Sequence, residues 1–244
     1  MLLSLLYHRV GNGKYANPLS LFNKHFPWIQ ERYQTVLPGE PLPKQDVVCL
    51  TFDDAYFDFY HYIFPLLKKH KLKAVLSVPV AFIPEKVSLH AEKRLEKILT
   101  LPEKTPPLPS PAYCTWDELK EMHNSGLVHI ASHSVNHFPL TTIKVDPEYE
   151  LLTSKNQLEK RLETKVTTFV YPYGRFNAHV HNLAKKHYPY IMRIGNAVNF
   201  SWQNANHLIY RINADDLASP QAPFHPIRRV KYLLRYLINT LRKK

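Results

Sequence analysis

Residues 47–54 read Val-Val-Cys-Leu-Thr-Phe-Asp-Asp, a short apolar run that stops at two carboxylates. Such a run, rich in β-branched residues, is typical of a strand buried in a parallel sheet. Asp53 and Asp54 cannot lie inside the sheet without a partner, because an unpaired buried charge is very costly. Two carboxylates this close favour a cation between them, or one of them has a raised pKa. The alternative is that an Asp at this position caps the helix that follows.

Similar apolar runs recur along the chain and alternate with helical patterns. Thr115 and Glu118 form the pattern of a capping box that opens one of the helices. This alternation predicts a parallel βαβ sheet, and 244 residues fit a single α/β barrel domain. Besides 47–52, we predict strands over 2–7, 74–78, 127–131, 168–171, 191–194 and 208–212, and helices over 57–70, 115–124 and 147–163. The Pro-rich residues 102–111 are predicted to form a surface loop.

The composition, 45% hydrophobic and 21% charged, is that of a globular protein and excludes collagen-like and wholly disordered chains. Cys49 and Cys114 are too few for a disulfide framework, and we expect buried thiols. The sequence contains neither an apolar run of about 18 residues nor the pattern of a cleaved signal peptide. We therefore expect a cytoplasmic protein.

A second group of polar residues, Ala131-Ser-His133-Ser-Val-Asn-His137, follows the predicted strand 127–131. If a helical turn begins here, both imidazoles face the same way. One Asp and two His would then make the three-ligand, open arrangement of a catalytic zinc. Chance pairing is the alternative, since the chain has 14 His residues.

The third group is Tyr171-Pro-Tyr173-Gly174, at the end of the predicted strand 168–171. Pro and Gly force a turn that exposes backbone N–H groups, and such groups can stabilise an oxyanion. An ordinary turn with aromatic packing is the alternative. All three groups follow the carboxyl ends of predicted parallel strands, where the active sites of α/β barrels and sheets are built. This shared position favours an active site over three unrelated features.

Taken in order, these three groups resemble the first three motifs of the polysaccharide deacetylases, carbohydrate esterase family four with its NodB-homology domain. Segments around His8, Phe64, Val78, Tyr113 and Trp116 are also similar, so the resemblance spans residues 1–215. The resemblance implies a distorted (β/α)7 barrel, similar to a TIM barrel, as a single catalytic domain over residues 1–225.

The same resemblance implies site residues and a reaction. A divalent metal, usually zinc, would be bound by Asp54, His133 and His137. Asp53 corresponds to the family's catalytic base, and Tyr173 to the residue whose backbone N–H helps to hold the oxyanion. The implied reaction is removal of an acetyl group, usually an N-acetyl group, from a sugar, an oligosaccharide or a cell-surface glycan precursor.

The sequence departs from the family pattern at two places. Many members open the third motif with an Arg that orients the base, and Val170 stands there instead. Arg211, near the end of a later predicted strand, is either its replacement or a surface residue. Many members also end with a Leu-x-His motif whose His is the general acid, and no late His follows that pattern. His8 is a candidate because it ends the first predicted strand, although a core or supporting role is the alternative.

Two other classes of function remain open at this point. A net charge of +12 and 12% aromatic residues fit a non-catalytic carbohydrate- or nucleic-acid-binding protein on the same barrel. However, seven of the Lys and Arg residues lie after Pro226, and we expect no nucleic-acid partner. A metal-free glycosidase using Asp53 and Asp54 is disfavoured, because adjacent carboxylates cannot flank a glycosidic bond.

Residues 226–244 predict a basic amphipathic helix at the end of the chain. Its apolar residues fall on one stripe, made of Val230, Leu233, Leu234, Leu237, Ile238 and Leu241. We expect this stripe to pack on the barrel, because a barrel needs outer helices. The alternative is that residues 228–244 lie on an anionic membrane surface.

Overall fold

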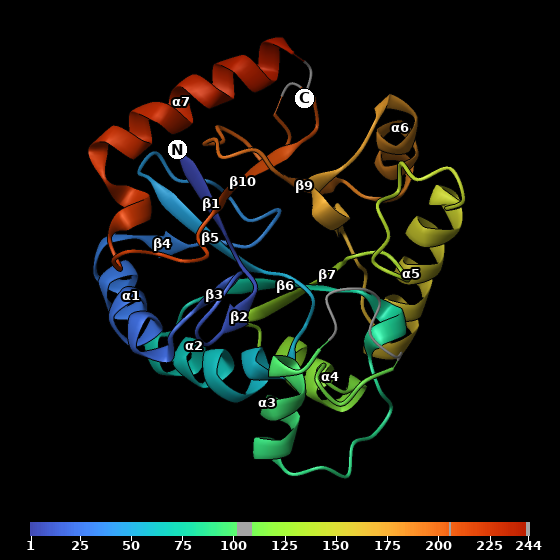
Figure 1. Cartoon of the computed structure of the whole chain (residues 1–244). Helices are drawn as coiled ribbons and strands as arrows, with labels where there is room; N and C mark the ends of the chain where they lie inside the picture. Colours follow the sequence, from blue (N-terminus) through green and yellow to red (C-terminus); the bar gives the residue numbers. More distant parts are fainter. Residues whose placement is uncertain (102–108, 205, 243–244) are drawn as a thin grey trace.

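The computed structural model describes residues 1–101, 109–204 and 206–242, and within them seven parallel strands form a closed barrel (Figure 1). Neighbours follow the order β1, β10, β9, β8, β7, β6, β5, and the pairing of β5 with β1 closes the ring, with Leu2 opposite Val47. The barrel strands are β1 (Leu2–Tyr7), β5 (Val47–Phe52), β6 (Ala74–Val78), β7 (Val128–Ser132), β8 (Thr168–Val170), β9 (Tyr190–Ile194) and β10 (Ile209–Asn213). All the predicted strands form, each within one residue of its expected ends, and the predicted α/β barrel is confirmed.

Helices cover the outside of the barrel, as the alternating pattern predicts (Figure 1). They are α1 (Leu19–Arg32), α2 (Phe64–His70), α3 (Ala91–Leu99), α4 (Trp116–Asn124), α5 (Pro147–Leu162), α6 (Ala178–His187) and α7 (Pro226–Leu241). A π-helical segment, η1 (Phe59–Ile63), leads directly into α2, and η2 (Val80–Phe82), η3 (Pro172–Gly174) and η4 (Ala222–Phe224) are short 3-10 turns. Short strands β2 (Arg9–Val10) and β3 (Ala16–Asn17) pair with each other, and β4 (Gln34–Thr35) pairs with β5.

The capping box at α4 is present, with Thr115 N–H donating to Glu118 at 2.7 Å and Glu118 N–H donating to Thr115 Oγ1 at 3.2 Å.

Alternate residues of each strand face different layers of the core, as the period of a strand requires. Val47, Val75 and Met192 belong to a small cluster inside the barrel, and Cys49 lies with them. Their neighbours along the strands, such as Val48, pack in the larger layer between barrel and helices. Both cysteines are buried free thiols, as expected. The inner position of β10 that follows Ile209 is taken by Arg211, a charged side chain that is fully buried and needs a partner there.

The Pro-rich loop predicted over residues 102–111 lies partly outside the described residues, because the structure describes only 109–111 of it. These last residues lead into the turn before α4, where Ser110 N–H donates to the carbonyl of Phe82 at 3.2 Å.

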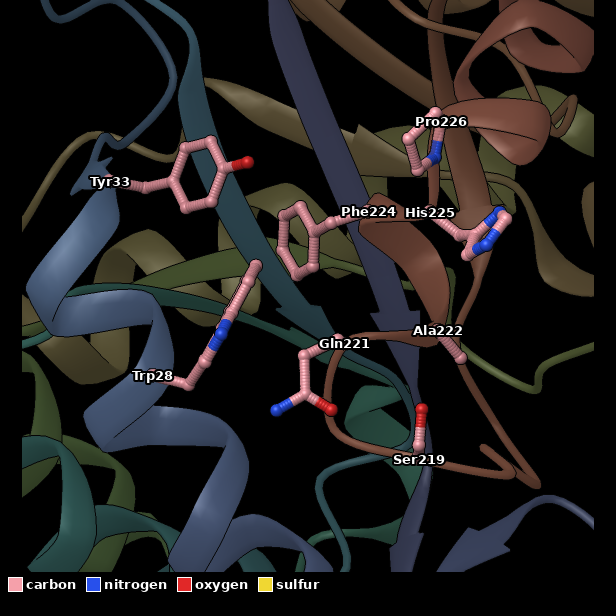
Figure 2. A pocket seen from close by; sticks show the side chains of 8 residues that line it. All are labelled: Trp28, Tyr33, Ser219, Gln221, Ala222, Phe224, His225 and Pro226. Carbon is pink, nitrogen blue, oxygen red and sulfur yellow. The ribbon is translucent and has the colours of Figure 1, made fainter.

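The connection from β10 to α7 runs back alongside α1 and ends in an aromatic cluster (Figure 2). Phe224 packs against Trp28 and Tyr33 at the end of α1, with ring centroids 4.7 Å and 4.8 Å away. These rings, with His225 and Pro226 at the start of α7, line a cavity of about 270 Å³ (Figure 2). The cluster fixes the place where α7 begins.

The expectation that the apolar stripe of the last helix packs on the barrel is wrong for every member of the stripe except Leu233. α7 does lie against the barrel, but Tyr232, Leu233 and Tyr236 make its apolar contacts. Most of the predicted stripe is exposed, including Val230, Leu234, Leu237, Ile238 and Leu241. The sequence pattern identified the more periodic apolar face, whereas large aromatic side chains on the other face are what the barrel buries.

Candidate active site

A cleft of about 690 Å³ opens at the carboxyl ends of the barrel strands. Every residue that the sequence singled out for chemistry lines it: Asp53, Asp54, His133, His137, Tyr173, Arg211 and His8. Aromatic side chains make up much of the remaining wall, namely Tyr15, Tyr56, Phe82, Tyr113, Phe138 and Tyr171. The three polar groups of the sequence therefore meet at one site, as their positions after parallel strands predict.

Asp54, His133 and His137 converge on one point of the cleft. The two His Nε2 atoms are 3.1 Å apart, and Asp54 Oδ1 lies 3.3 Å from His137 Nε2 and 3.7 Å from His133 Nε2. Ligand atoms bound to one tetrahedral zinc at about 2.0–2.1 Å stand about 3.4 Å from each other. The spacing of these three atoms fits that geometry.

Two further observations show that these residues suit a metal. Asp54 Oδ1 is buried and has no hydrogen-bond donor among the described residues. His133 Nδ1 lies 2.7 Å from the carbonyl of Val170, which fixes Nδ1 as the protonated nitrogen and leaves the Nε2 lone pair facing the cleft. Burial lowers the pKa of His133 to about 4, with the nearby His137 acting in the same direction and Asp53 opposing it, so the ring is neutral at pH 7, as a metal ligand must be.

The backbone is held in the left-handed region at the residues that form this point. The φ angles of Asp54, Ser134, His137 and Tyr173 are +73°, +69°, +54° and +57°. Non-glycine residues avoid this region unless the surroundings impose it, and such residues gather at functional sites. The helical turn expected at residues 133–137 does not form, because Ser134 and His137 both leave the helical region. The two imidazoles meet through a strained loop instead.

A buried carboxylate on α5 holds that loop. Glu150 Oε2 accepts hydrogen bonds from the N–H groups of Val135 and Asn136 at 2.7 Å and 2.9 Å, and Oε1 accepts one from Asn136 Nδ2 at 2.7 Å. The Ser134 hydroxyl also accepts a bond from the His137 N–H at 3.0 Å. These bonds compensate for the strained backbone and set the position of His137.

Asp53 lies beside Asp54, His133 and His137 and accepts hydrogen bonds from two buried side chains. Arg211 binds it through both ends of its guanidinium, with Nη1 2.6 Å from Oδ1 and Nη2 2.9 Å from Oδ2, and Ser77 Oγ donates to Oδ1 at 2.7 Å. Burial acts to raise the pKa of Asp53, but the charge of Arg211, helped by His133 and His8, holds it well below its usual range. Arg211 is thus a buried partner of Asp53 and no surface residue.

His8 and Asp215 form a hydrogen-bonded pair next to Asp53. His8 Nδ1 lies 2.7 Å from Asp215 Oδ2, and the His8 N–H donates to Asp215 Oδ1 at 3.1 Å. Burial by itself lowers the pKa of His8, but the hydrogen bond and the charge of Asp215, together with Asp53 and Asp54, raise it to about 9. His8 Nε2 is 3.9 Å from Asp53 Oδ2 and lines the cleft. A protonated imidazole therefore faces the same space as the ionised Asp53.

Tyr173 lies on the turn η3 at the rim of the cleft. Its ring is half exposed and stands 4.8 Å from the His137 ring, centroid to centroid. The neighbouring N–H groups of the turn are used internally, because Gly174 donates to Tyr171 at 2.9 Å and Arg175 to Pro172 at 3.2 Å.

Sequence reasoning missed three residues of this site. Asp215 follows β10 by two positions, so the same rule that singled out Asp53 would have found it. Ser77, inside β6, and Glu150, inside α5, carried no such signal. The role of Ser77 depends on β6 being the neighbour of β5, and the role of Glu150 depends on α5 covering the loop that carries His133 and His137.

The seven-stranded (β/α) barrel gathers Asp53, Asp54, His133 and His137 at one rim. The family model described as polysaccharide deacetylase matches residues 41–190. The chain belongs to the polysaccharide deacetylase family.

Particular relatives support this assignment. YxkH of Bacillus subtilis (strain 168), named as a polysaccharide deacetylase, is 27% identical over 193 residues, which cover 75% of this chain and 60% of that protein. The poly-beta-1,6-N-acetyl-D-glucosamine N-deacetylase of Escherichia coli (strain K12) is 33% identical over 127 residues, 48% of this chain and 17% of that protein. The chain thus spans less than two thirds of either relative, 60% of the first and 17% of the second.

Among solved structures, the Streptococcus pyogenes deacetylase PplD in complex with acetate is similar, with a TM-score of 0.73 and 25% identity over 91% of this chain and 96% of that one. IcaB from Ammonifex degensii shares the fold, with a TM-score of 0.70 and 21% identity over 88% of this chain and 92% of that one.

Proposed function

We propose that this chain is a zinc-dependent hydrolase that removes acetyl groups, chiefly N-acetyl groups, from a saccharide. The observation that carries the proposal is the convergence of Asp54, His133 and His137 at metal-ligand spacing beside the buried Asp53. Membership of the polysaccharide deacetylase family supports the same reaction class.

Asp54, His133 and His137 would hold the metal. Two neutral imidazoles and one carboxylate leave at least one coordination position open, as catalytic zinc sites do. When bound, the ion lowers the pKa of a water molecule and polarises the acetyl carbonyl.

Asp53 would accept the proton of the attacking water. Arg211 keeps this carboxylate ionised and fixes its direction, because the two groups are joined by two parallel hydrogen bonds. Oδ1 accepts hydrogen bonds from both Ser77 and Arg211, whereas Oδ2 accepts one from Arg211 and lies 3.9 Å from His8 Nε2. Oδ2 is therefore the oxygen that would take the proton. The Arg211 guanidinium would replace the Arg that many family members carry at the position of Val170.

His8 would donate the proton to the departing amine. It is protonated at neutral pH, is held by Asp215 and opens onto the cleft next to Asp53. General acid catalysis of this kind requires the acid to be protonated at the working pH and within reach of the leaving group. The backbone N–H of Tyr173 would stabilise the oxyanion at the other side of the acetyl group.

A saccharide suits the walls of the cleft. Tyr15, Tyr56, Tyr113 and Tyr173 offer flat apolar faces with polar tips, and Arg9 and Lys14 add hydrogen-bond donors. The N-acetyl group as target is supported by the name of the Escherichia coli relative, a poly-N-acetylglucosamine N-deacetylase. The cytoplasmic location and the lack of a nucleic-acid partner stay predictions.

Metal analysis and acetate release test this proposal. The purified protein should contain stoichiometric zinc and release acetate from N-acetylated oligosaccharides. His133→Ala should lose the metal, whereas Asp53→Asn should keep it and lose activity by about a hundredfold or more, since Asn cannot accept a proton. His179→Ala and Asp117→Asn, both exposed, are matched controls that should behave like the parent. Full metal occupancy in His133→Ala, or normal turnover in Asp53→Asn, would contradict the assignment.

A further inference from the structure

The last helix, α7, packs on the barrel through one face only. Tyr232 is 8% exposed, and the Tyr236 ring meets those of Phe200 and Tyr210 at centroid distances of 4.9 Å and 6.2 Å. Arg229 on the same face forms an ion pair with Asp46. Together with the aromatic cluster at its start (Figure 2), these contacts hold the helix in a fixed orientation along the outside of the barrel (Figure 1).

The opposite face carries an apolar stripe that the barrel leaves uncovered. Its side chains are 41–84% exposed. At about 100° per residue, they span about 100° of the helix circumference and point about 150° away from the barrel-facing Tyr236. The stripe consists of Ile227, Val230, Leu234, Leu237, Ile238 and Leu241.

The exposed aliphatic side chains of the protein are concentrated on α7. Six of the ten exposed Leu, Ile and Val side chains among the described residues lie on α7. Single exposed apolar residues are ordinary on protein surfaces, but a contiguous exposed patch marks an interaction site. The stripe therefore has the character of an interaction surface.

Charge indicates which partner. Arg228, Lys231, Arg235 and Arg242 lie along one edge of the stripe, and the sequence from residue 226 to 244 contains no Asp or Glu. A second copy of this helix placed on the stripe would bring these cations together without any acid on either helix to offset them. An anionic lipid surface offers acyl chains for the stripe and phosphates for the basic edge.

Within the described residues, no helix is both long enough and apolar enough to cross a bilayer, so α7 would lie flat on such a surface. Its length, from Pro226 to Leu241, and its single apolar face are those of an interfacial helix.

We propose that α7 docks this protein on an anionic membrane surface, with the apolar stripe inserted between lipid headgroups and the basic edge against their phosphates. Docking would also place the catalytic cleft near the lipid. Asn239 of α7 donates a hydrogen bond to the carbonyl of Gly195 at 3.1 Å, and the preceding Ile194 lines the cleft. This inference does not depend on the hydrolytic activity.

Vesicle co-sedimentation of the full chain tests it. The probes are vesicles of phosphatidylcholine alone and of phosphatidylcholine mixed with phosphatidylglycerol. We expect binding to the anionic vesicles and little to the neutral ones. Leu234→Gln/Leu237→Gln should weaken binding by about tenfold or more, because two apolar side chains no longer insert. Leu99→Gln/Ile143→Gln, which changes two exposed side chains elsewhere, is the matched control and should bind like the parent.

Three outcomes would overturn the proposal. One is parent protein that stays in the supernatant with anionic vesicles at low salt. Another is equal binding of Leu234→Gln/Leu237→Gln and the parent, which would mean that the positive charge alone attracts the lipid. The third is a concentration-dependent dimer of the parent, seen by light scattering and lost in the same variant, which would make the stripe a contact between two copies. A far-UV circular dichroism spectrum and a Tm equal to those of the parent would show that the variants are folded.

Discussion

At the scale of single residues, the pairing of charges around Asp53 decides what the site can do. Arg211 and Asp53 are both buried, and breaking such a pair would leave an uncompensated charge. The sequence identified both residues but left Arg211 between two interpretations, because a residue's partner across a barrel has no local signal. Only the closure of the ring, in which β10 and β5 pair with the two edges of β1, places the Arg211 guanidinium on the Asp53 carboxylate.

His8 offers a test by titration at this scale. In the metal-free protein its pKa should be about 9, measured by NMR of the ring protons, because Asp215 opposes the effect of burial. Asp215→Asn should bring that pKa down to the ordinary 6.5 or lower, since the desolvation that lowers it remains. An unchanged pKa in Asp215→Asn would show that Asp215 does not hold the proton on His8.

The raised pKa of His8 also fixes the sign of a pH effect on stability. The folded state binds this proton more tightly than the unfolded state, so the stabilisation is fully present below pH 6.5. It is lost as the pH rises from 6.5 through about 9. In that window the free energy of unfolding should fall more steeply for the parent than for His8→Gln.

At the scale of elements, the loop that carries His133 and His137 shows that residue spacing alone does not predict local backbone conformation. Their spacing of four suggested a helical turn, but Glu150 on α5 provides hydrogen bonds that a helix would have supplied internally. α7 shows the same limit. Both faces of α7 carry apolar residues. The face that packs on the barrel is the one whose Tyr236 contacts Phe200 and Tyr210, and no local sequence pattern connects those two residues with the helix.

Glu150→Gln should weaken metal binding without unfolding the protein. The carboxylate accepts three hydrogen bonds from Val135 and Asn136, and an amide replaces one acceptor oxygen by a donor, so at least one bond is lost. Residues that position metal ligands typically contribute about 10–100-fold in affinity. Zinc competition with a chromophoric chelator measures the change.

The matched control for that variant is Glu163→Gln, whose side chain is exposed at the end of the same helix. It should bind zinc like the parent. Parent-like zinc affinity in Glu150→Gln would mean that the loop holds its shape without this carboxylate.

At the scale of the whole molecule, the barrel brings together groups that the chain keeps far apart. His8, Asp53 and His133 directly follow three strands, Arg211 lies within a fourth, β10, and the closed ring brings all four side chains to one cleft. This much could be predicted from the sequence, because strand ends in a parallel barrel share one edge. The unfolded chain has no such site, so a metal that binds these ligands must favour the folded state.

Metal removal should therefore lower the thermal stability of the entire domain. Free zinc at about 1,000 times its Kd stabilises the folded state by about 4 kcal/mol, which raises the Tm of a chain of this size by about 10 °C. Calorimetry with excess zinc and with a chelator measures the shift. His133→Ala removes one of three ligands, so its Tm should be the same under both conditions, whereas the exposed His179→Ala should keep the full shift. A parent Tm that does not respond to zinc would show that the three converging side chains hold no metal, and the hydrolytic mechanism built on them would fail with it.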